Sequence, residues 1–185
     1  MKKNLLLALD ASTKCSGWAV FDCETKELVD YDYILCSNKN LHQRIDVMIE
    51  EIDKVLLKFQ PEEVILEEVL PADVKNNNNV FKALIYLQGF IVHLLEKKEI
   101  KYSFVVSSTW RKQCGIHLGV QNKRESLKGQ SIFFVKEHYN LTNINDDVAD
   151  AICIGHSRLN NDLKKETNPI EKDNKVKKIG SFEFV

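Results

Sequence analysis

Glycine-rich loops are missing from this chain, whose seven glycines are scattered along 185 residues. The phosphate loops of nucleotide sites need several glycines close together, so the sequence argues against an ATP-binding protein. The five cysteines are odd in number and widely spaced, without a C-x-x-C pair. This pattern indicates neither a zinc site nor a disulfide framework, and it favours a reducing compartment.

Long hydrophobic runs are missing as well, and no stretch approaches the length of a transmembrane helix. The N-terminal run MKKNLLLALD is broken by Asp10 and is not followed by a small-residue cleavage site, which is untypical of a signal peptide. We therefore expect a cytoplasmic protein without a membrane segment.

The composition, with 44% hydrophobic and 29% charged residues, is typical of a globular protein. The length fits a single domain, which we place at residues 1–160. Residues 161–185 are charged and poor in core residues, so we expect a mobile C-terminal tail.

Apolar periodicity predicts an α/β fold with a five-stranded mixed sheet flanked by helices. The continuous apolar run at residues 5–9 is typical of a strand buried on both faces. The first three strands are expected to pair antiparallel, and a helical crossover places the fourth parallel to the first. A short helical turn follows the fifth strand, with Ser108 or Thr109 as its cap. The predicted strands cover residues 4–9, 17–21, 28–35, 64–70 and 101–106, and the predicted long helices cover residues 40–59, 80–97, 123–139 and 146–160.

Acidic side chains recur where three of these elements are expected to bring them together. Asp10 ends the first strand, and Glu67 or Glu68 ends the neighbouring fourth strand. Asp147 and Asp150 share one face of the last helix. Small apolar residues surround Asp150, so this turn should pack against the sheet, where an inward acid is unusual for structure alone.

Each of these acids could by itself be a cap or a surface charge, but together they favour a metal site. Hard carboxylate oxygens without histidine or cysteine ligands favour Mg²⁺ over zinc. Two such ions can activate a water and stabilise the leaving oxygen of a phosphodiester. The set therefore predicts metal-dependent phosphodiester hydrolysis by Asp10, Glu67, Asp147 and Asp150.

Basic residues far outnumber acidic ones between positions 75 and 136, although the net charge of the chain is only −1. A basic half beside a small acidic cluster suits a protein that holds a polyanion over a cation site. Any single lysine here could simply be solvated surface. Trp110 is interpreted as a partly buried anchor, with stacking on a base as the alternative. The candidate DNA contacts, which flank the acidic motifs in sequence, are Lys75, Lys82, Arg111, Lys112, Lys123, Arg124 and Lys128.

The order of these motifs resembles that of a known family. A strand, an aspartate, a turn and a second strand are followed by I-L-E-E-V at residues 65–69 and by D-x-x-A-D-A at residues 146–151. Over about residues 4–158 this pattern resembles the RuvC family of Holliday-junction resolvases, within the RNase H-like superfamily. It is most similar to the short phage-encoded branch. The resemblance implies an RNase H-like sheet and a homodimer that makes paired cuts.

The resemblance also implies an activity and a set of site residues. The expected activity is a Mg²⁺-dependent endodeoxyribonuclease that cleaves Holliday junctions and other branched DNA, with two ions per site and Mn²⁺ as a substitute. It would act in the cytoplasm, or in the host cytoplasm if the protein is phage-encoded. The family's basic residues fall on Arg111 or Lys112 and on Lys123. Its catalytic and metal-binding acids fall on Asp10, Glu67, Asp147 and Asp150, with Glu68 and Asp146 as alternatives.

Two features of the family are less evident in this chain. The loop that meets the junction centre corresponds to about residues 70–80, where no aromatic wedge is evident unless Phe81 serves. This departure favours an enzyme that cuts several kinds of branched DNA. The helix at 80–97 has Leu87, Phe90 and Leu94 outside its main apolar stripe, which fits either a dimer interface or the most buried helix of a monomer.

Three other functions remain open from the sequence. An RNase H-type or DNA-repair nuclease would use the same four acids on other substrates. An actin-like phosphotransferase would share the entry from strand to aspartate to hairpin, but it needs the clustered glycines that are missing here. A non-catalytic DNA-binding relative is disfavoured because all four acids are present.

Overall fold

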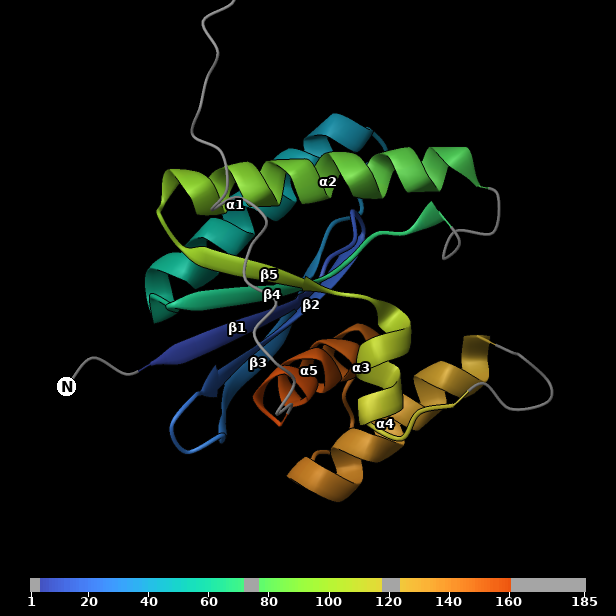
Figure 1. The fold of residues 1–185 in the computed structure, drawn as a ribbon. Helices are drawn as coiled ribbons and strands as arrows, with labels where there is room; N and C mark the ends of the chain where they lie inside the picture. The colour runs from blue at the N-terminus through green and yellow to red at the C-terminus, as the bar shows by residue number, and fades with distance from the viewer. Residues whose placement is uncertain (1–3, 72–76, 118–123, 161–185) are drawn as a thin grey trace, which may run out of the picture.

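The computed structural model describes residues 4–71, 77–117 and 124–160, so the predicted tail at 161–185 lies outside the described residues. Five strands form one mixed sheet, with α1 and α2 on one face and α3, α4 and α5 on the other (Figure 1). None of the described helices is long and apolar enough to cross a membrane. The strands are β1 (Leu5–Asp10), β2 (Cys15–Asp22), β3 (Leu28–Leu35), β4 (Glu63–Glu67) and β5 (Lys101–Val105). The helices are α1 (Leu41–Phe59), α2 (Asn78–Lys97), α3 (Ser107–Gln113), α4 (Arg124–Tyr139) and α5 (Asp146–Leu159).

The order of strands in the sheet is β3-β2-β1-β4-β5. β1 pairs antiparallel with β2 and parallel with β4, and β5 is parallel to β4. The predicted mixed sheet of three antiparallel strands followed by two parallel ones is therefore confirmed. Because parallel strands end at the same edge of a sheet, the carboxyl ends of β1, β4 and β5 meet at one edge.

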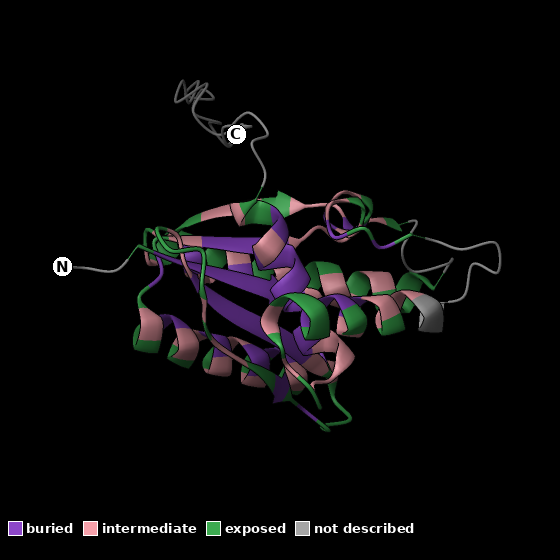
Figure 2. Ribbon diagram, turned by 90° about the horizontal axis from the view of Figure 1, so that it is seen from below, coloured by how far each residue is buried: buried purple, intermediate pink, exposed green. Residues whose placement is uncertain are grey.

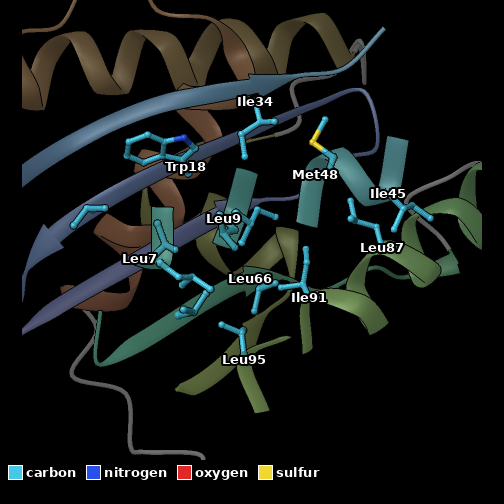
Figure 3. Packing of buried hydrophobic residues seen from close by; sticks show 14 of the residues in the cluster. Leu7, Leu9, Trp18, Ile34, Ile45, Met48, Leu66, Leu87, Ile91 and Leu95 are labelled. Carbon is cyan, nitrogen blue, oxygen red and sulfur yellow. The ribbon is translucent and has the colours of Figure 1, made fainter. Parts of the chain in front are cut away.

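β1 is buried on both faces, as its continuous apolar run predicts. Leu5, Leu7 and Leu9 pack against α1 and α2, whereas Leu6 and Ala8 pack against the helices of the other face. The central strands are buried along most of their length (Figure 2). Figure 3 shows the cluster between the sheet and α1 and α2, in which Leu7, Leu9 and Leu66 meet side chains from both helices.

α5 packs directly on the sheet, because two glycines leave room for it. A β-carbon at Gly17 of β2 would come within 2.7 Å of the Val148 backbone nitrogen and would overlap the backbone carbonyl of Asp147. Further along α5, a β-carbon at Gly155 would overlap the ring of Phe21. The start of α5 is therefore held against the strand that pairs with the end of β1.

The structure corrects several predicted element ends, among them the start of β2, which lies at Cys15 rather than at residue 17. β4 ends at Glu67 rather than at residue 70, because the chain leaves the sheet there. The short helix α3 begins at Ser107, and its capping residue is the extended Val106, which makes no side-chain cap hydrogen bond. The prediction of Ser108 or Thr109 as the cap is therefore wrong, since both residues lie inside the helix.

Candidate active site

Asp10 and Glu67 lie side by side at the carboxyl ends of two adjacent parallel strands. β1 and β4 pair in register as far as Leu9 and Leu66, so Asp10 and Glu67 are the next residues in line. Their side chains point to the face covered by α5, because strand alternation gives them the same side as Ala8 and Ile65, which pack there.

α5 brings the other two acids to the same edge of the sheet. The helix begins at a capping residue, Asn145, whose side-chain oxygen accepts a hydrogen bond from the Val148 N–H at 2.7 Å. Gly17 lies under the backbone of Asp147, and Gly17 is also the residue that pairs with Asp10 across β1 and β2. The first turn of α5 therefore lies over the end of β1.

The electrostatic environment of Asp10 shows that the other three predicted acids lie close to it. The pKa of Asp10 is raised well above its usual value, first by burial and then by Glu67, Asp150 and Asp147, in that order. Arg111 opposes this shift. The alternative Glu68 is not among these groups; it lies just past β4, where its backbone N–H donates to the Val105 carbonyl at 2.9 Å.

Asp150 is the most deeply placed acid of α5. Burial raises its pKa, while a hydrogen bond from Ser131 and the charges of Arg111 and Lys128 oppose the shift. Its Oδ1 atom is buried and has no hydrogen-bond partner. Because a buried carboxylate oxygen without a partner is costly, this atom fits a site that a cation completes.

The acids are gathered but do not form a ready-made ligand shell. Among the described residues, no three histidine, cysteine, aspartate or glutamate side chains stand in a metal-ligating arrangement. The neighbouring carboxylates raise one another's pKa values, and a bound cation would offset this repulsion. The donor set, which consists of carboxylates alone, fits a hard divalent cation.

The raised pKa of Asp10 gives a testable pH dependence. The folded chain holds this proton at higher pH than the unfolded chain does, so the free energy of unfolding of metal-free protein should fall as pH rises above about 4. Glu67, Asp147, Asp150 and Arg111 face this group. Thermal unfolding in EDTA from pH 5 to pH 8 should therefore show a steeper fall for the wild type than for Asp10→Asn. Equal slopes would contradict the assignment.

Trp110 orients the carboxylate of Glu67. Its indole Nε1–H donates a hydrogen bond of 2.7 Å to Glu67 Oε2. The guanidinium carbon of Arg111 lies 4.7 Å from the centre of the Trp110 ring. Trp110 is fully buried, so the alternative of stacking on a base is wrong; the residue is an anchor, although it is completely rather than partly buried.

The predicted basic residues lie in different places. The charge of Arg111 lowers the pKa of both Asp10 and Asp150. Lys112 on α3 and Lys82 on α2 are exposed. Lys128 forms an ion pair with Asp146, so this alternative acid is paired with a lysine at the edge of the cluster. Three predicted contacts cannot be placed: Lys75 and Lys123 lie outside the described residues, and the side chain of Arg124 is not described.

Sequence reasoning missed two residues that contact the acids. The Cys15 thiol hydrogen-bonds to Asp147. The pKa of Cys15 is raised to about 12, mainly by burial and secondly by this hydrogen bond. Ser131 of α4 is buried and hydrogen-bonds to Asp150. Neither residue belongs to a motif, and both contacts depend on how α4 and α5 pack, so no local pattern could have indicated them.

The chain was compared with known protein families. The family model described as crossover junction endodeoxyribonuclease RuvC matches residues 6–157. The chain belongs to this RuvC family. RuvC of Fusobacterium nucleatum is 28% identical over 158 residues, which cover 82% of this chain and 78% of that relative. RuvC of a Wolbachia from Brugia malayi is 25% identical over 157 residues, covering 80% of this chain and 91% of the relative.

Solved structures of RuvC and of another Holliday junction resolvase have the same fold. Thermus thermophilus RuvC, in a complex with a Holliday junction substrate, matches with a TM-score of 0.66 and 14% identity, over 83% of this chain and 91% of that chain. The yeast mitochondrial Holliday junction resolvase Ydc2 matches with a TM-score of 0.52 and 14% identity, over 85% of this chain and 78% of that chain. The predicted RNase H-like fold is confirmed by these matches.

Proposed function

We propose that this RuvC-family chain is a metal-dependent endodeoxyribonuclease that cleaves Holliday junctions and other branched DNA. The observation that carries the proposal is the gathering of four acids around the carboxyl end of β1, where Glu67, Asp147 and Asp150 all act on the charge of Asp10. The family match over residues 6–157 supports the same activity, since its members are named crossover junction endodeoxyribonucleases.

Mg²⁺ is the proposed cofactor, with two ions per site and Mn²⁺ as a substitute. Asp10, Glu67, Asp147 and Asp150 would hold the ions, and the buried Oδ1 of Asp150 supports this assignment. When bound, the ions would supply an activated water and stabilise the leaving oxygen of the phosphodiester. Because only the ionised carboxylate is a ligand and the pKa of Asp10 is raised, metal binding at this residue should strengthen as pH rises.

The basic side chains of the chain are assigned to the DNA backbone. Arg111 lies beside the acids, where it can neutralise the phosphate that is cut. Lys112 and Lys82 are exposed and can contact phosphates farther away. Such contacts give affinity without reading sequence, so junction binding should weaken strongly with salt. The same role is proposed for Lys75, Lys123, Arg124 and Lys128.

A homodimer is proposed because two symmetric cuts need two sites. The solvent side of α2 has large exposed apolar side chains, among them Tyr86 at 49% and Phe90 at 53% exposure. Leu87 was predicted, like Phe90, to lie outside the main apolar stripe of this helix. It is instead fully buried, on the same side of α2 as Ile91 and Leu95. The proposed interface is therefore centred on Tyr86 and Phe90.

Replacing Phe90 with aspartate should weaken dimerisation at least about tenfold, because it places a charge where apolar surface would be buried. Sedimentation velocity over a range of concentrations measures this. Leu57→Asp is a matched control, since Leu57 is 61% exposed on α1. A wild type that stays monomeric, or an unchanged Phe90→Asp dimer, would contradict the proposed interface.

The substrate is tested by incubating the purified protein with labelled DNAs in Mg²⁺ or EDTA. The panel is a four-way junction, a three-way junction, a flap, a linear duplex and an RNA–DNA hybrid. Metal-dependent paired nicks in the four-way junction are the expected result, with cutting of the three-way and flap DNAs if selectivity is relaxed. Cutting of the hybrid alone would indicate an RNase H-type enzyme, and junction binding without any cutting would overturn the proposal.

The five free cysteines support a reducing, cytoplasmic setting for this activity.

A further inference from the structure

The Trp110 side chain contacts both Glu67, one of the four acids, and Arg111. The residue lies in the seven-residue helix α3, directly after β5, and its side chain is fully buried among residues of β4, α4 and α5. From this position it donates a hydrogen bond to Glu67 and lies under the guanidinium of Arg111. One buried ring therefore contacts both the acidic and the basic part of the site.

The contact with Glu67 fixes the position of one of its carboxyl oxygens. An indole N–H can only donate, so Glu67 Oε2 accepts from it and the carboxyl group is held in one orientation. Hydrogen bonds to charged groups are stronger than neutral ones, and here the donor–acceptor distance is 2.7 Å. Glu67 stands beside Asp10, so a fixed donor offsets part of the repulsion between them.

The contact with Arg111 limits where that side chain can lie. A guanidinium stacked on an indole face is attracted by the negative face of the ring. At 4.7 Å from the ring centre, Arg111 is held within reach of Asp10 and Asp150, on whose charges it acts. Without the ring, Arg111 would be a long side chain on a short helix with many rotamers to occupy.

We propose that Trp110 is a positioning residue that fixes the orientation of the Glu67 carboxylate for metal binding and holds Arg111 beside the acids. This inference rests on the proposed metal-dependent function of the acidic cluster. It predicts that Trp110 sets the metal affinity of the site through its N–H and the placement of Arg111 through its ring.

Trp110→Phe tests the first part, because phenylalanine keeps an aromatic ring but loses the donor. Mn²⁺ affinity, measured by isothermal titration calorimetry, should fall by roughly tenfold to a hundredfold, which is the effect of one hydrogen bond to a charged group. Cleavage at low Mn²⁺ should fall in parallel and should recover as Mn²⁺ is raised. A variant that had merely failed to fold would not recover.

Trp18→Phe is the matched control. Trp18 is 7% exposed and lies on the other face of the sheet, in contact with Phe59, so its replacement perturbs a buried tryptophan away from the acids (Figure 3). It should leave Mn²⁺ affinity unchanged. In a Glu67→Gln background, Trp110→Phe should cause little further loss, because the two changes act through one contact.

The outcomes separate this inference from the proposed function. If the wild type neither binds Mn²⁺ nor cuts DNA, the proposed function fails. If the wild type does both and Trp110→Phe binds Mn²⁺ with wild-type affinity, only the role of Trp110 is overturned.

Discussion

Asp10→Asn should lower the rate of junction cleavage by on the order of 10²- to 10³-fold, as expected for loss of one charged group that acts in the transition state. Asp10 is the residue around which Glu67, Asp147 and Asp150 gather. Asparagine has nearly the same shape but offers only a neutral amide oxygen to a cation. Single-turnover cleavage of a labelled four-way junction in Mg²⁺ measures the effect.

The same substitution should leave junction binding intact, because it removes negative charge from a surface that approaches phosphates. A mobility-shift assay in EDTA checks this. Asp46→Asn, at an exposed position of α1, is the control and should cut at the wild-type rate. An Asp10→Asn protein that retains cleavage within tenfold of wild type would remove this residue from the catalytic set.

Gly17→Ala should reduce both stability and cleavage. The added methyl group would overlap the carbonyl of Asp147 and come within 2.7 Å of the Val148 nitrogen, and neither backbone atom can move without α5. Overpacking of this kind costs about 1–3 kcal/mol. Because the displaced turn carries Asp147, cleavage should fall further than the lost stability explains. Urea denaturation and single-turnover cleavage below the unfolding midpoint separate the two effects.

Gly129→Ala is the matched control for Gly17→Ala. Gly129 lies in α4, and a β-carbon there would meet nothing within 4 Å. Alanine is the better helix former by about 0.5–1 kcal/mol, so this variant should be slightly stabilised. If Gly17→Ala behaved like Gly129→Ala, the close approach of α5 to β2 would not be needed for the site.

Residues whose environment is set by local pattern could be predicted from the sequence. The unbroken apolar run of β1 indicated a strand buried on both faces, and the helical crossover placed β4 beside it. These two inferences are enough to bring Asp10 and Glu67 together. Glu67 was preferred to Glu68 through the family resemblance and strand alternation, since the pattern did not show that β4 ends at Glu67.

Residues whose role depends on tertiary contacts could not be predicted. Trp110 was predicted as a partly buried anchor, but Arg111 and Lys112 follow it, and the sequence indicated neither its complete burial nor its contact with Glu67. The closeness of Gly17 to Asp147 depends on how α5 docks, which no spacing reveals. Leu87 was assigned to the wrong side of α2 because the helix is apolar over much of its circumference, which leaves its inward direction ambiguous.

The docking of α5 on the sheet also determines at which stage of chain synthesis the four acids come together. Asp10 and Glu67 belong to strands made early in synthesis, whereas Asp147 and Asp150 arrive with the final described helix. Domains acquire such long-range contacts only after the contributing segments have left the ribosome. On the proposed mechanism, a nascent or truncated chain that lacks α5 would have half of its acids, so the ability to cut DNA is acquired only when the domain has been made in full.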